Sequence, residues 1–516
     1  MSQRRWTRRQ FVGASAASVL LSSSLPSYGL RNSLDDVKDA TLRARLAADP
    51  LRPQFHLLPA KNWMNDPNGP IYWKGHYHMF FQYNPNAAVW GDMHWNHAIS
   101  DDMVHWKHLP IALAPTPGWD DSDGCFTGSA VDDHGTATIL YTGVKTVPPQ
   151  RATLRDGHAN FREVQCLATS SDPQLRSWTK WTSPVIEPPQ DLPITGFRDP
   201  FLWRAGDTWY LGVASGLRKV GGNVLLFRSR DLRKWEYLHP LAQGKWTGRD
   251  AVNAVDSGEM WECPDFFALG GKHVLLYSTA GKVAWETGEL DTKELVFHSQ
   301  RQGILDHGAY YAQKTQVDAR GNRILWGWIT EKRGDDELRA AGWAGCMSLP
   351  RVLSLNPAGD LEMRVAPQVE KLRGKSLSVS GGSQSERASA VRRIEIEDLC
   401  GELFWRTSAS SASLVLADRG GAWFSCAFEN AGGSAKLTVN GKSIGMPMSG
   451  ERQHECQIFV DGSVAELLCD KGHAITTRTY RKPDGPLRIA PNSSPRDFGE
   501  LSVWQLHPIS KDRLTT

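Results

Sequence analysis

This sequence of 516 residues lacks long apolar runs and long runs of one charge sign. Beyond residue 30, no apolar run is long enough to cross a bilayer as a helix, so we expect no stable membrane insertion. Residues 1–30 contain four arginines and no acid, and without them the net charge falls from +3 to −1. No basic stripe remains to follow a phosphate backbone, which argues against nucleic acid as a partner.

Metal-ligand spacing is also missing. The eight cysteines form no C-x-x-C pair of the kind found in zinc and redox sites. Histidines crowd residues 56–108, but His94 and His97 are three residues apart on a strand-like run and would point to opposite faces. We therefore expect buried thiols, histidines in packing or substrate-rim roles, and neither a metal nor another cofactor.

The first thirty residues have the pattern of an export signal. The segment "TRRQFV" (7–12) precedes a short, weakly apolar stretch rich in alanine and serine. This order resembles a bacterial twin-arginine signal, because the apolar stretch follows the arginine pair at once. A basic tail is the weaker alternative. The interpretation predicts a periplasmic or extracellular protein, with cleavage near residues 27–30.

The remaining composition favours an all-β protein of at least two domains. Its 21 tryptophans and 47 glycines suit short strands and tight turns, and its length exceeds one ordinary core. Residues 31–51 contain a predicted short helix over 33–48, which Ser33 could cap. Beyond it, short β-runs alternate with turns from about residue 52 to residue 365.

A loose repeat runs through this β-rich region. Three similar stretches are "SDDMVHWKHL" (100–109), "SSDPQLRSWTKW" (170–181) and "SRDLRKWEYL" (229–238). An interval of roughly sixty residues is typical of one β-propeller blade. Residues 366–390 are rich in serine and glycine and are expected to form a linker. Residues 391–510 contain strand-like runs at the spacing of a β-sandwich.

Three acids lie beside aromatic residues or prolines instead of in charged surface runs: Asp66 in "WMNDPNG", Asp199 in "FRDP" and Glu262 in "WECPDFF". Each alone is more often a turn or strand-end acid. Their separations of 133 and 63 residues correspond to two blades and one blade of a propeller. Equivalent positions in a blade can face one axis, and carboxylates that flank a bond are the usual means of breaking a glycosidic linkage.

These motifs make the chain resemble glycoside hydrolase family 32, which includes invertases, levanases, inulinases and other fructan hydrolases. The further matching motifs, in the family's order, are "FFQYNP" (80–85), "VWGDMHWNHAISDDMVHW" (89–106), "CFTGSAV" (125–131), "YYAQKT" (310–315), "WAGCMSLPR" (343–351) and "IFVDGSVAEL" (458–467). The likeness covers about residues 52–508. With the repeat, it predicts an all-β fold: a five-bladed β-propeller catalytic domain over 52–365, followed by a C-terminal β-sandwich over 391–510.

The resemblance also implies roles. Asp66 corresponds to the nucleophile, Glu262 to the general acid/base, and Asp199 to the residue that binds fructose hydroxyls and stabilises the transition state. The residues expected to bind substrate are Trp63, Asn65, Gln82, Trp90, Phe126, Thr127 and Arg198. The family usually has serine where Thr127 stands, so the hydroxyl is kept. Cys263 matches the family's Glu-Cys pair and would tune the surroundings of Glu262.

The implied reaction is retaining hydrolysis of terminal β-D-fructofuranosyl units of sucrose or of fructans such as levan and inulin. A fructosyltransferase with the same fold is the alternative. A non-catalytic sugar-binding propeller is disfavoured, because all three acids are present. Sucrose-specific plant members that this chain resembles tend to carry an Asp-x-x-Lys pair shortly after their Arg-Asp-Pro. Here Asp207 has no lysine three residues later, so the resemblance leans towards fructan or mixed specificity.

Overall fold

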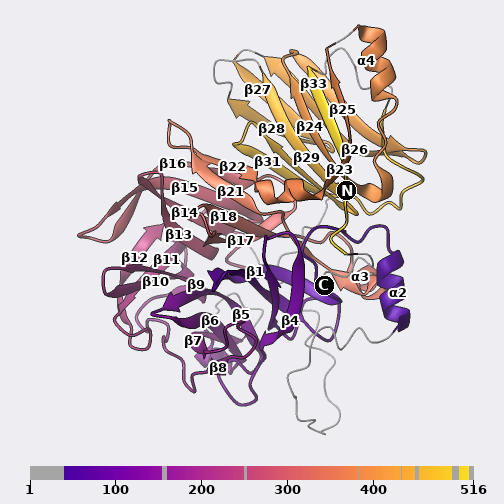
Figure 1. Ribbon diagram of the computed structural model, residues 1–516. Coiled ribbons are helices and arrows are strands. Elements are labelled where there is room, and N and C mark those ends of the chain that lie inside the picture. The colour runs from indigo at the N-terminus through magenta and orange to yellow at the C-terminus, as the bar shows by residue number, and fades with distance from the viewer. Residues whose placement is uncertain are drawn as a thin grey trace.

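The computed structural model describes residues 40–153, 160–248, 253–381, 383–431, 433–447, 453–490 and 499–510, and these are mostly antiparallel sheet (Figure 1). The predicted export signal and Ser33 lie outside these ranges. Helix α2 (Ala40–Ala48) buries Leu46 and coincides with the second half of the predicted N-terminal helix. Within the described ranges, no helix has the length and apolar character needed to cross a membrane.

Five sheets follow one another along residues 62–365. Their strands are β1 (Asn62–Trp73), β2 (His76–Asn84), β3 (His94–Ser100) and β4 (Trp106–Leu113); β5 (Gly124–Asp133), β6 (Thr136–Thr146), β7 (Phe161–Ser170) and β8 (Thr179–Lys180); β9 (Ile194–Ala205), β10 (Thr208–Leu217), β11 (Gly221–Ser229) and β12 (Glu236–Gln243); β13 (Glu262–Leu269), β14 (Lys272–Thr279), β15 (Lys282–Asp291) and β16 (Val296–Asp306); and β17 (Tyr310–Val317), β18 (Arg323–Ile329), β21 (Arg351–Leu355) and β22 (Leu361–Val365). The first strands of successive sheets lie against one another, and β17 lies against β1. The sheets form the predicted five-bladed propeller.

Short elements complete this unit. The 3₁₀ turn η2 (Pro149–Arg151) follows β6, and helix α3 (Asp335–Ala341) follows β18. Strand β19 (Trp343–Ala344) then pairs in parallel with β1, and β20 (Cys346–Met347) pairs with β18. A segment from the end of the propeller chain thereby extends the first blade.

The predicted repeat is the corner between the third and fourth strands of a blade. In the third blade, the amide of Asp231 donates to the hydroxyl of Ser229 at 3.1 Å, and the indole of Trp235 donates to the carbonyl of Leu232 at 2.9 Å. Leu232 has a φ of +60°, which turns the chain into the next strand. The same indole bond joins Trp106 to Met103 and Trp178 to Leu175. The repeat therefore encodes a turn and its locking bond.

The second unit is a sandwich of two antiparallel sheets, orange to yellow in Figure 1. The six-stranded sheet contains β23 (Arg373–Ser380), β33 (Glu500–Leu506), β24 (Cys400–Thr407), β29 (His454–Asp461), β30 (Val464–Cys469) and β31 (His473–Arg478). The five-stranded sheet contains β28 (Lys442–Pro447), β27 (Ser434–Val439), β26 (Gly421–Ala431), β25 (Ser411–Asp418) and β32 (Arg488–Ile489). Their alternating apolar side chains form one core, which includes Leu403, Trp405, Leu414 and Phe428.

The predicted linker is wrong. Residues 367–391 form the 3₁₀ turn η3 (Pro367–Leu372), strand β23 and helix α4 (Gln384–Val391), and η4 (Glu397–Leu399) follows. Strand β23 is the edge of the sandwich and pairs with β33, more than a hundred residues later in the chain. Ser383 and Glu386 form a capping box at the start of α4. The serine-rich composition did not indicate a strand, because β23 pairs with residues far along the chain.

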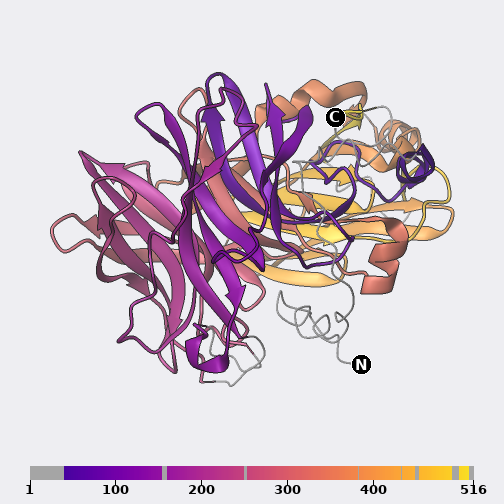
Figure 2. The ribbon, with the colours of Figure 1, turned by 90° about the horizontal axis from the view of Figure 1, so that it is seen from below.

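Buried charges join the two units. His56 lies between two sandwich carboxylates, with Nδ1 2.7 Å from Asp461 and Nε2 2.8 Å from Glu466. Burial alone would lower the pKa of His56, but hydrogen bonds to both carboxylates outweigh burial and raise the pKa to about 9. Arg351 of the propeller also contacts Glu466, and it donates to Asp306 at 3.0 Å. The two acids of the "IFVDGSVAEL" motif thus hold the sandwich to the propeller, and the two units lie side by side in Figure 2.

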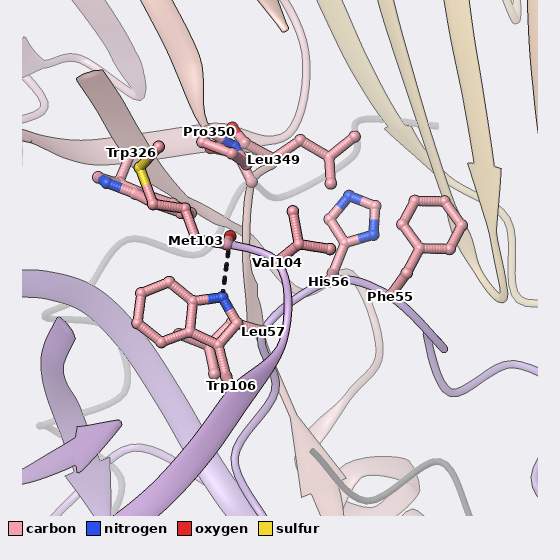
Figure 3. Close-up of a pocket in the computed structure, with 10 residues that line it drawn as sticks. Phe55, His56, Leu57, Met103, Val104, Trp106, Trp326, Leu349 and Pro350 are labelled. Atoms are coloured by element: carbon pink, nitrogen blue, oxygen red, sulfur yellow. Dashed lines mark hydrogen bonds between the residues drawn. The ribbon is translucent and has the colours of Figure 1, made fainter. Parts of the chain in front are cut away.

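A small recess lies beside this junction (Figure 3). Its lining residues are Phe55, His56, Leu57, Met103, Val104, Trp106, Trp326, Ser348, Leu349 and Pro350. Within it, the indole of Trp106 donates to the carbonyl of Met103 at 3.1 Å. None of the three candidate acids lines the recess, and its space is on the scale of a water molecule. It is a packing gap and no substrate site.

Two fully buried histidines of the first blade make stability sensitive to acid. His78 and His97 share one hydrogen bond of 2.9 Å, and their other ring nitrogens have no protein partner within the described ranges. Burial, together with neighbouring histidines, lowers the pKa of His78 to about 4 and that of His97 well below its usual value. Between the unfolded value of about 6.5 and these folded values, the unfolded chain binds more protons, so acid favours unfolding.

We expect the free energy of unfolding to fall as pH drops from about 6.5 towards 4, by on the order of 3 kcal/mol for His78 alone. Urea unfolding at half-unit pH steps measures this. His97→Gln should flatten the dependence, whereas His134→Gln, whose side chain is 66% exposed, should leave it unchanged. Equal slopes for these two variants would contradict the prediction.

Candidate active site

The innermost strands carry the three candidate acids. Asp66 lies in β1, Asp199 in β9 and Glu262 in β13, which belong to the first, third and fourth blades. The separations predicted from the sequence, two blades and then one, are therefore confirmed. All three residues lie at the centre of the propeller and are at most 2% exposed.

Irregular pairing orients these residues. Each innermost strand slips in register against its neighbour next to the site, and the slips contain Asp66 in β1, Thr127 in β5, Asp199 in β9, Cys263 in β13 and Ala312 in β17. Such a bulge redirects side chains and leaves a residue outside the hydrogen-bond ladder. Proline lacks an amide proton, so it is tolerated there and not in a regular central strand.

Three bulged residues have strained backbones. Ala312 has a φ of +53°, and Asp199 and Cys263 have φ values of +61° and +47°, which residues with side chains rarely adopt. The buried ammonium of Lys314 donates to the carbonyls of the prolines that follow Asp199 and Cys263, at 3.4 Å for Pro200 and 3.0 Å for Pro264. One side chain of the fifth blade therefore ties β9 and β13 together.

The thiol of Cys263 lies between two carboxylates. Its Sγ atom is 3.3 Å from Oδ2 of Asp66 and 3.3 Å from Oδ2 of Asp199. The amide of Cys263 also donates to Oδ2 of Asp199 at 2.9 Å. Because a thiol has one proton, it can donate to only one of these carboxylates at a time. Cys263 thus links the acids of the first and third blades to the strand that carries Glu262.

Asp66 is held by two further donors. The hydroxyl of Thr127 donates to Oδ2 at 2.6 Å, and the side-chain amide of Asn65 donates to Oδ1 at 2.9 Å. The indole of Trp63 donates to Oδ1 of Asn65 at 2.7 Å and so sets the direction of that amide. The carboxylate is therefore fixed in orientation by neighbours from two blades.

Glu262 contacts an arginine and a tyrosine. Nε and Nη2 of Arg198 donate to its Oε1 at 3.1 and 2.7 Å, and the hydroxyl of Tyr311 donates to its Oε2 at 2.8 Å. Nη1 of Arg198 donates to Glu163 at 3.0 Å. Burial alone would lower the pKa of Arg198, but Glu163, Glu262 and Asp199 raise it above its usual range, so the guanidinium stays charged.

Aromatic residues gather at one edge of the acids. Trp63, Trp90 and Phe126 belong to one apolar cluster, with Trp90 packed edge-on against Phe126 at 5.9 Å between ring centres. Trp328 packs against Trp63 at 5.7 Å and is partly exposed, as is Trp90. Gln82 bonds to the backbone of Cys125, beside Phe126, at 2.8 Å. Of the residues expected to bind substrate, Trp63, Trp90 and Phe126 share this cluster, and Gln82 is tied to the strand of Phe126.

Three residues of this site were missed. Glu163 lies in no motif, Tyr311 lies in "YYAQKT" without an expected role, and Trp328 precedes the last motif of the propeller. Prolines after Asp66, Asp199 and Cys263 mark bulges in strands that otherwise look central, but no proline follows any of the three missed residues. Glu163 could not be found in this way, because its partner Arg198 comes from another blade.

The structure gives no support to the substrate preference inferred from Asp207. This residue lies in the turn between β9 and β10, its side chain is 87% exposed, and it pairs with Arg204 at 3.6 Å. The second half of β9 therefore lies between Asp199 and Asp207, and the substrate preference stays a prediction.

One group of potential metal ligands occurs in the described ranges: His454, Cys469 and Asp470, in the sandwich. Nδ1 of His454 bonds to Asp470 at 2.8 Å and Nε2 bonds to Asn430 at 2.9 Å, so protein groups already occupy both ring nitrogens. The eight cysteines are free thiols and buried, as predicted.

Known proteins resemble the chain in both sequence and structure. Residues 56–366 match the N-terminal domain of glycosyl hydrolases family 32. Sucrose-6-phosphate hydrolase of Escherichia coli is 34% identical over 470 residues, which cover 84% of this chain and 90% of that protein. Raffinose invertase of Escherichia coli is 38% identical over 346 residues, which cover 64% and 67%.

Solved structures agree with this. A family 32 β-fructofuranosidase of Bombyx mori, also solved as a variant with sucrose, has a TM-score of 0.73 and 28% identity over 92% of this chain and 98% of its own. Fructan 1-exohydrolase IIa of Cichorium intybus, also solved as a variant with 1-kestose, has a TM-score of 0.74 and 25% identity over 89% and 98%.

The buried pair between Arg198 and Glu163 makes a stability prediction. Glu163→Gln should lower the free energy of unfolding by about 3 kcal/mol, because it removes one partner of a buried ion pair and an acceptor for the amide of Phe197. Glu187→Gln is the matched control, since Glu187 pairs with Arg162 at a surface where the glutamate is 52% exposed. That control should cost less than about 1 kcal/mol. Similar urea midpoints for the two variants would refute the prediction.

Proposed function

The chain belongs to glycoside hydrolase family 32, and we propose that it is a retaining β-fructofuranosidase acting on terminal β-D-fructofuranosyl units of sucrose and fructans. The main support is the convergence of Asp66, Asp199 and Glu262 from three blades around Cys263. A carboxylate held in a fixed orientation, a second carboxylate and a third acid on the neighbouring strand are the groups that such a reaction needs. The names of the relatives given above support sucrose as the first substrate to test.

In the first step, Asp66 attacks the anomeric carbon of the fructosyl unit. Its two oxygens are held by Thr127 and Asn65, so little motion is needed to align the attacking lone pair. Protonated Glu262 gives its proton to the departing glycosidic oxygen. The products are a fructosyl ester on Asp66 and the released alcohol or sugar.

In the second step, Glu262 takes a proton from water, and the water oxygen attacks the same anomeric carbon. The ester bond to Asp66 breaks, and fructose leaves with its configuration retained. In this proposal, Asp199 accepts hydrogen bonds from fructose hydroxyls as positive charge develops on the ring. Retention requires carboxyl groups about 5–5.5 Å apart for Asp66 and Glu262.

Glu262 must hold a proton although Arg198 donates to it. Glu163 explains how this is possible, because its negative charge already balances the positive charge of the Arg198 guanidinium. A neutral Glu262 can then lie beside the cation without leaving that cation unpaired. Tyr311 holds the other oxygen of Glu262 and orients the carboxyl group.

The burial of the acids favours action on chain ends. Residues at most 2% exposed can meet a terminal fructosyl unit more readily than the middle of a polymer. Trp90 and Trp328 are partly exposed and offer apolar faces to the sugar. We also propose, from the twin-arginine pattern at residues 7–12, that the enzyme is exported. Incubation with sucrose, inulin and levan, with chromatography of the products over time, tests substrate and mode of action.

Asp66→Asn should reduce turnover of sucrose by about 10³-fold or more, because the first step loses its nucleophile. Initial rates of fructose release measure this, with circular dichroism to show that the fold is retained. Asp207→Asn serves as the control, since Asp207 is exposed at the far end of β9. Retention of more than a tenth of the activity in Asp66→Asn would exclude Asp66 as the nucleophile.

Glu262→Gln should slow sucrose far more than an aryl fructoside with an acidic leaving group. Proton donation matters least when the departing oxygen already carries negative charge well. The ratio of kcat/KM for the two substrates, compared between variant and wild type, measures the difference. An unchanged ratio would mean that Glu262 does not protonate the leaving group.

A further inference from the structure

A short segment links the sandwich to the first catalytic strand. After helix α3, residues Trp343 and Ala344 form β19 and pair with Asn62 and Trp63 at the start of β1. Gly345 follows with a φ of +75°, and a Cβ atom there would lie 2.0 Å from the carbonyl oxygen of Met64. The backbone of this segment therefore touches the residues that directly precede Asn65 and Asp66.

Glu331 holds this segment in place. Its Oε1 accepts from the amide of Gly345 at 2.8 Å, from Nη2 of Arg333 at 3.0 Å and from Nη2 of Arg478 at 3.0 Å. Its Oε2 accepts from Nε of Arg333 at 3.1 Å and from the hydroxyl of Tyr480. The Glu331 side chain is 3% exposed. Burial alone would raise the pKa of Glu331, but Arg478 and Arg333 lower it to about 2, so it remains an anion.

Two of these donors come from the sandwich. Arg478 ends strand β31, and Tyr480 follows two residues later. Arg478 is fully buried and also donates to the hydroxyl of Ser463, within the sandwich, at 2.8 Å. The sandwich therefore presents one fixed cation and one fixed hydroxyl to a carboxylate of the propeller.

The same charges clamp β19. The guanidinium of Arg333 lies over the Trp343 ring, 4.4 Å from its centre, and donates to the Trp343 carbonyl at 3.1 Å. The indole of Trp343 donates to Asp49 at 2.7 Å. Contacts then continue from β19 to Trp63, from Trp63 to Asn65 and from Asn65 to Asp66.

We propose that the β-sandwich positions the first catalytic strand through Glu331, with Arg478 and Tyr480 as positioning residues. This inference rests on the proposed function of Asp66. It gives the sandwich a part in the reaction in addition to its packing. Loss of either donor would let Gly345 and β19 move, and with them Trp63 and the side-chain amide of Asn65 that orients Asp66.

The experiment uses the full chain with Tyr480→Phe, which removes one hydroxyl, and Arg478→Met, which removes the cation at similar length. Ile458→Val is the matched control, because Ile458 is a buried residue of the sandwich core away from Glu331, and its loss of one methyl group destabilises the same unit. Steady-state rates with sucrose at 25 °C are measured beside thermal unfolding. Hydrogen–deuterium exchange is followed in a peptide covering residues 62–68.

We expect kcat/KM to fall about tenfold in Tyr480→Phe and further in Arg478→Met, with most of the loss in kcat, because small misplacements of reacting groups are felt mainly in the transition state. Exchange in residues 62–68 should rise in both variants. In Ile458→Val, both quantities should stay within twofold of wild type despite a lower melting temperature.

Two results would overturn the inference: exchange in residues 62–68 that does not differ from the control, or raised exchange with kcat/KM equal to that of the control. If wild type turned over neither sucrose nor a fructan, the proposed function would fail by itself. The exchange measurement would still decide whether the sandwich donors hold the first strand.

Discussion

The arrangement at the propeller axis depends on burying several carboxylates around one guanidinium. Arg198 donates to Glu262 and to Glu163, and both acids are almost fully buried. An isolated buried charge is costly, whereas a paired and hydrogen-bonded one is tolerated. Because Glu163 already pairs with Arg198, the arginine can stay charged whether Glu262 is an anion or neutral. Glu262 can therefore give up and regain a proton without leaving the buried arginine unpaired. The surrounding aromatic residues and the ring of sheets keep these charged groups buried and fixed in place.

The ring also explains how strained residues persist. Asp199 and Cys263 keep a positive φ because their strands are held on both sides of each bulge by backbone hydrogen bonds. The contacts of Cys263 and the ammonium of Lys314 hold the same strands. A regular strand would send successive side chains to alternate faces and could not direct neighbouring functional groups to one point. The slip in register of each innermost strand is therefore the means by which a sheet structure builds a convergent site.

Buried ion pairs recur where the sandwich meets the propeller. His56 lies between Asp461 and Glu466, and Arg478 meets Glu331, with all of these side chains nearly inaccessible. Such pairs add little net stability compared with apolar contacts, but a mismatched partner leaves a charge unpaired. They therefore suit a junction whose alignment matters, because any shift between the two units separates charges that have no access to water. Glu331 connects this junction to β1, the first strand of the site.

The sequence alone determined the fold class, the family and the three acids, because these depend on local motifs and on a period that is carried along the chain. The separations of Asp66, Asp199 and Glu262 by two blades and one blade followed from that period. Only the tertiary structure decided which side chains meet: Glu163 and Tyr311 come from blades that no motif connects to Glu262. Likewise, residues 373–380 became a strand because a partner far along the chain completes their hydrogen bonds, and Asp207 proved remote because β9 carries it to the other end of the blade. Local propensity and motif spacing depend on residues that are close in the sequence. Distant strands pair, and two acids share one buried arginine, only once the chain has folded.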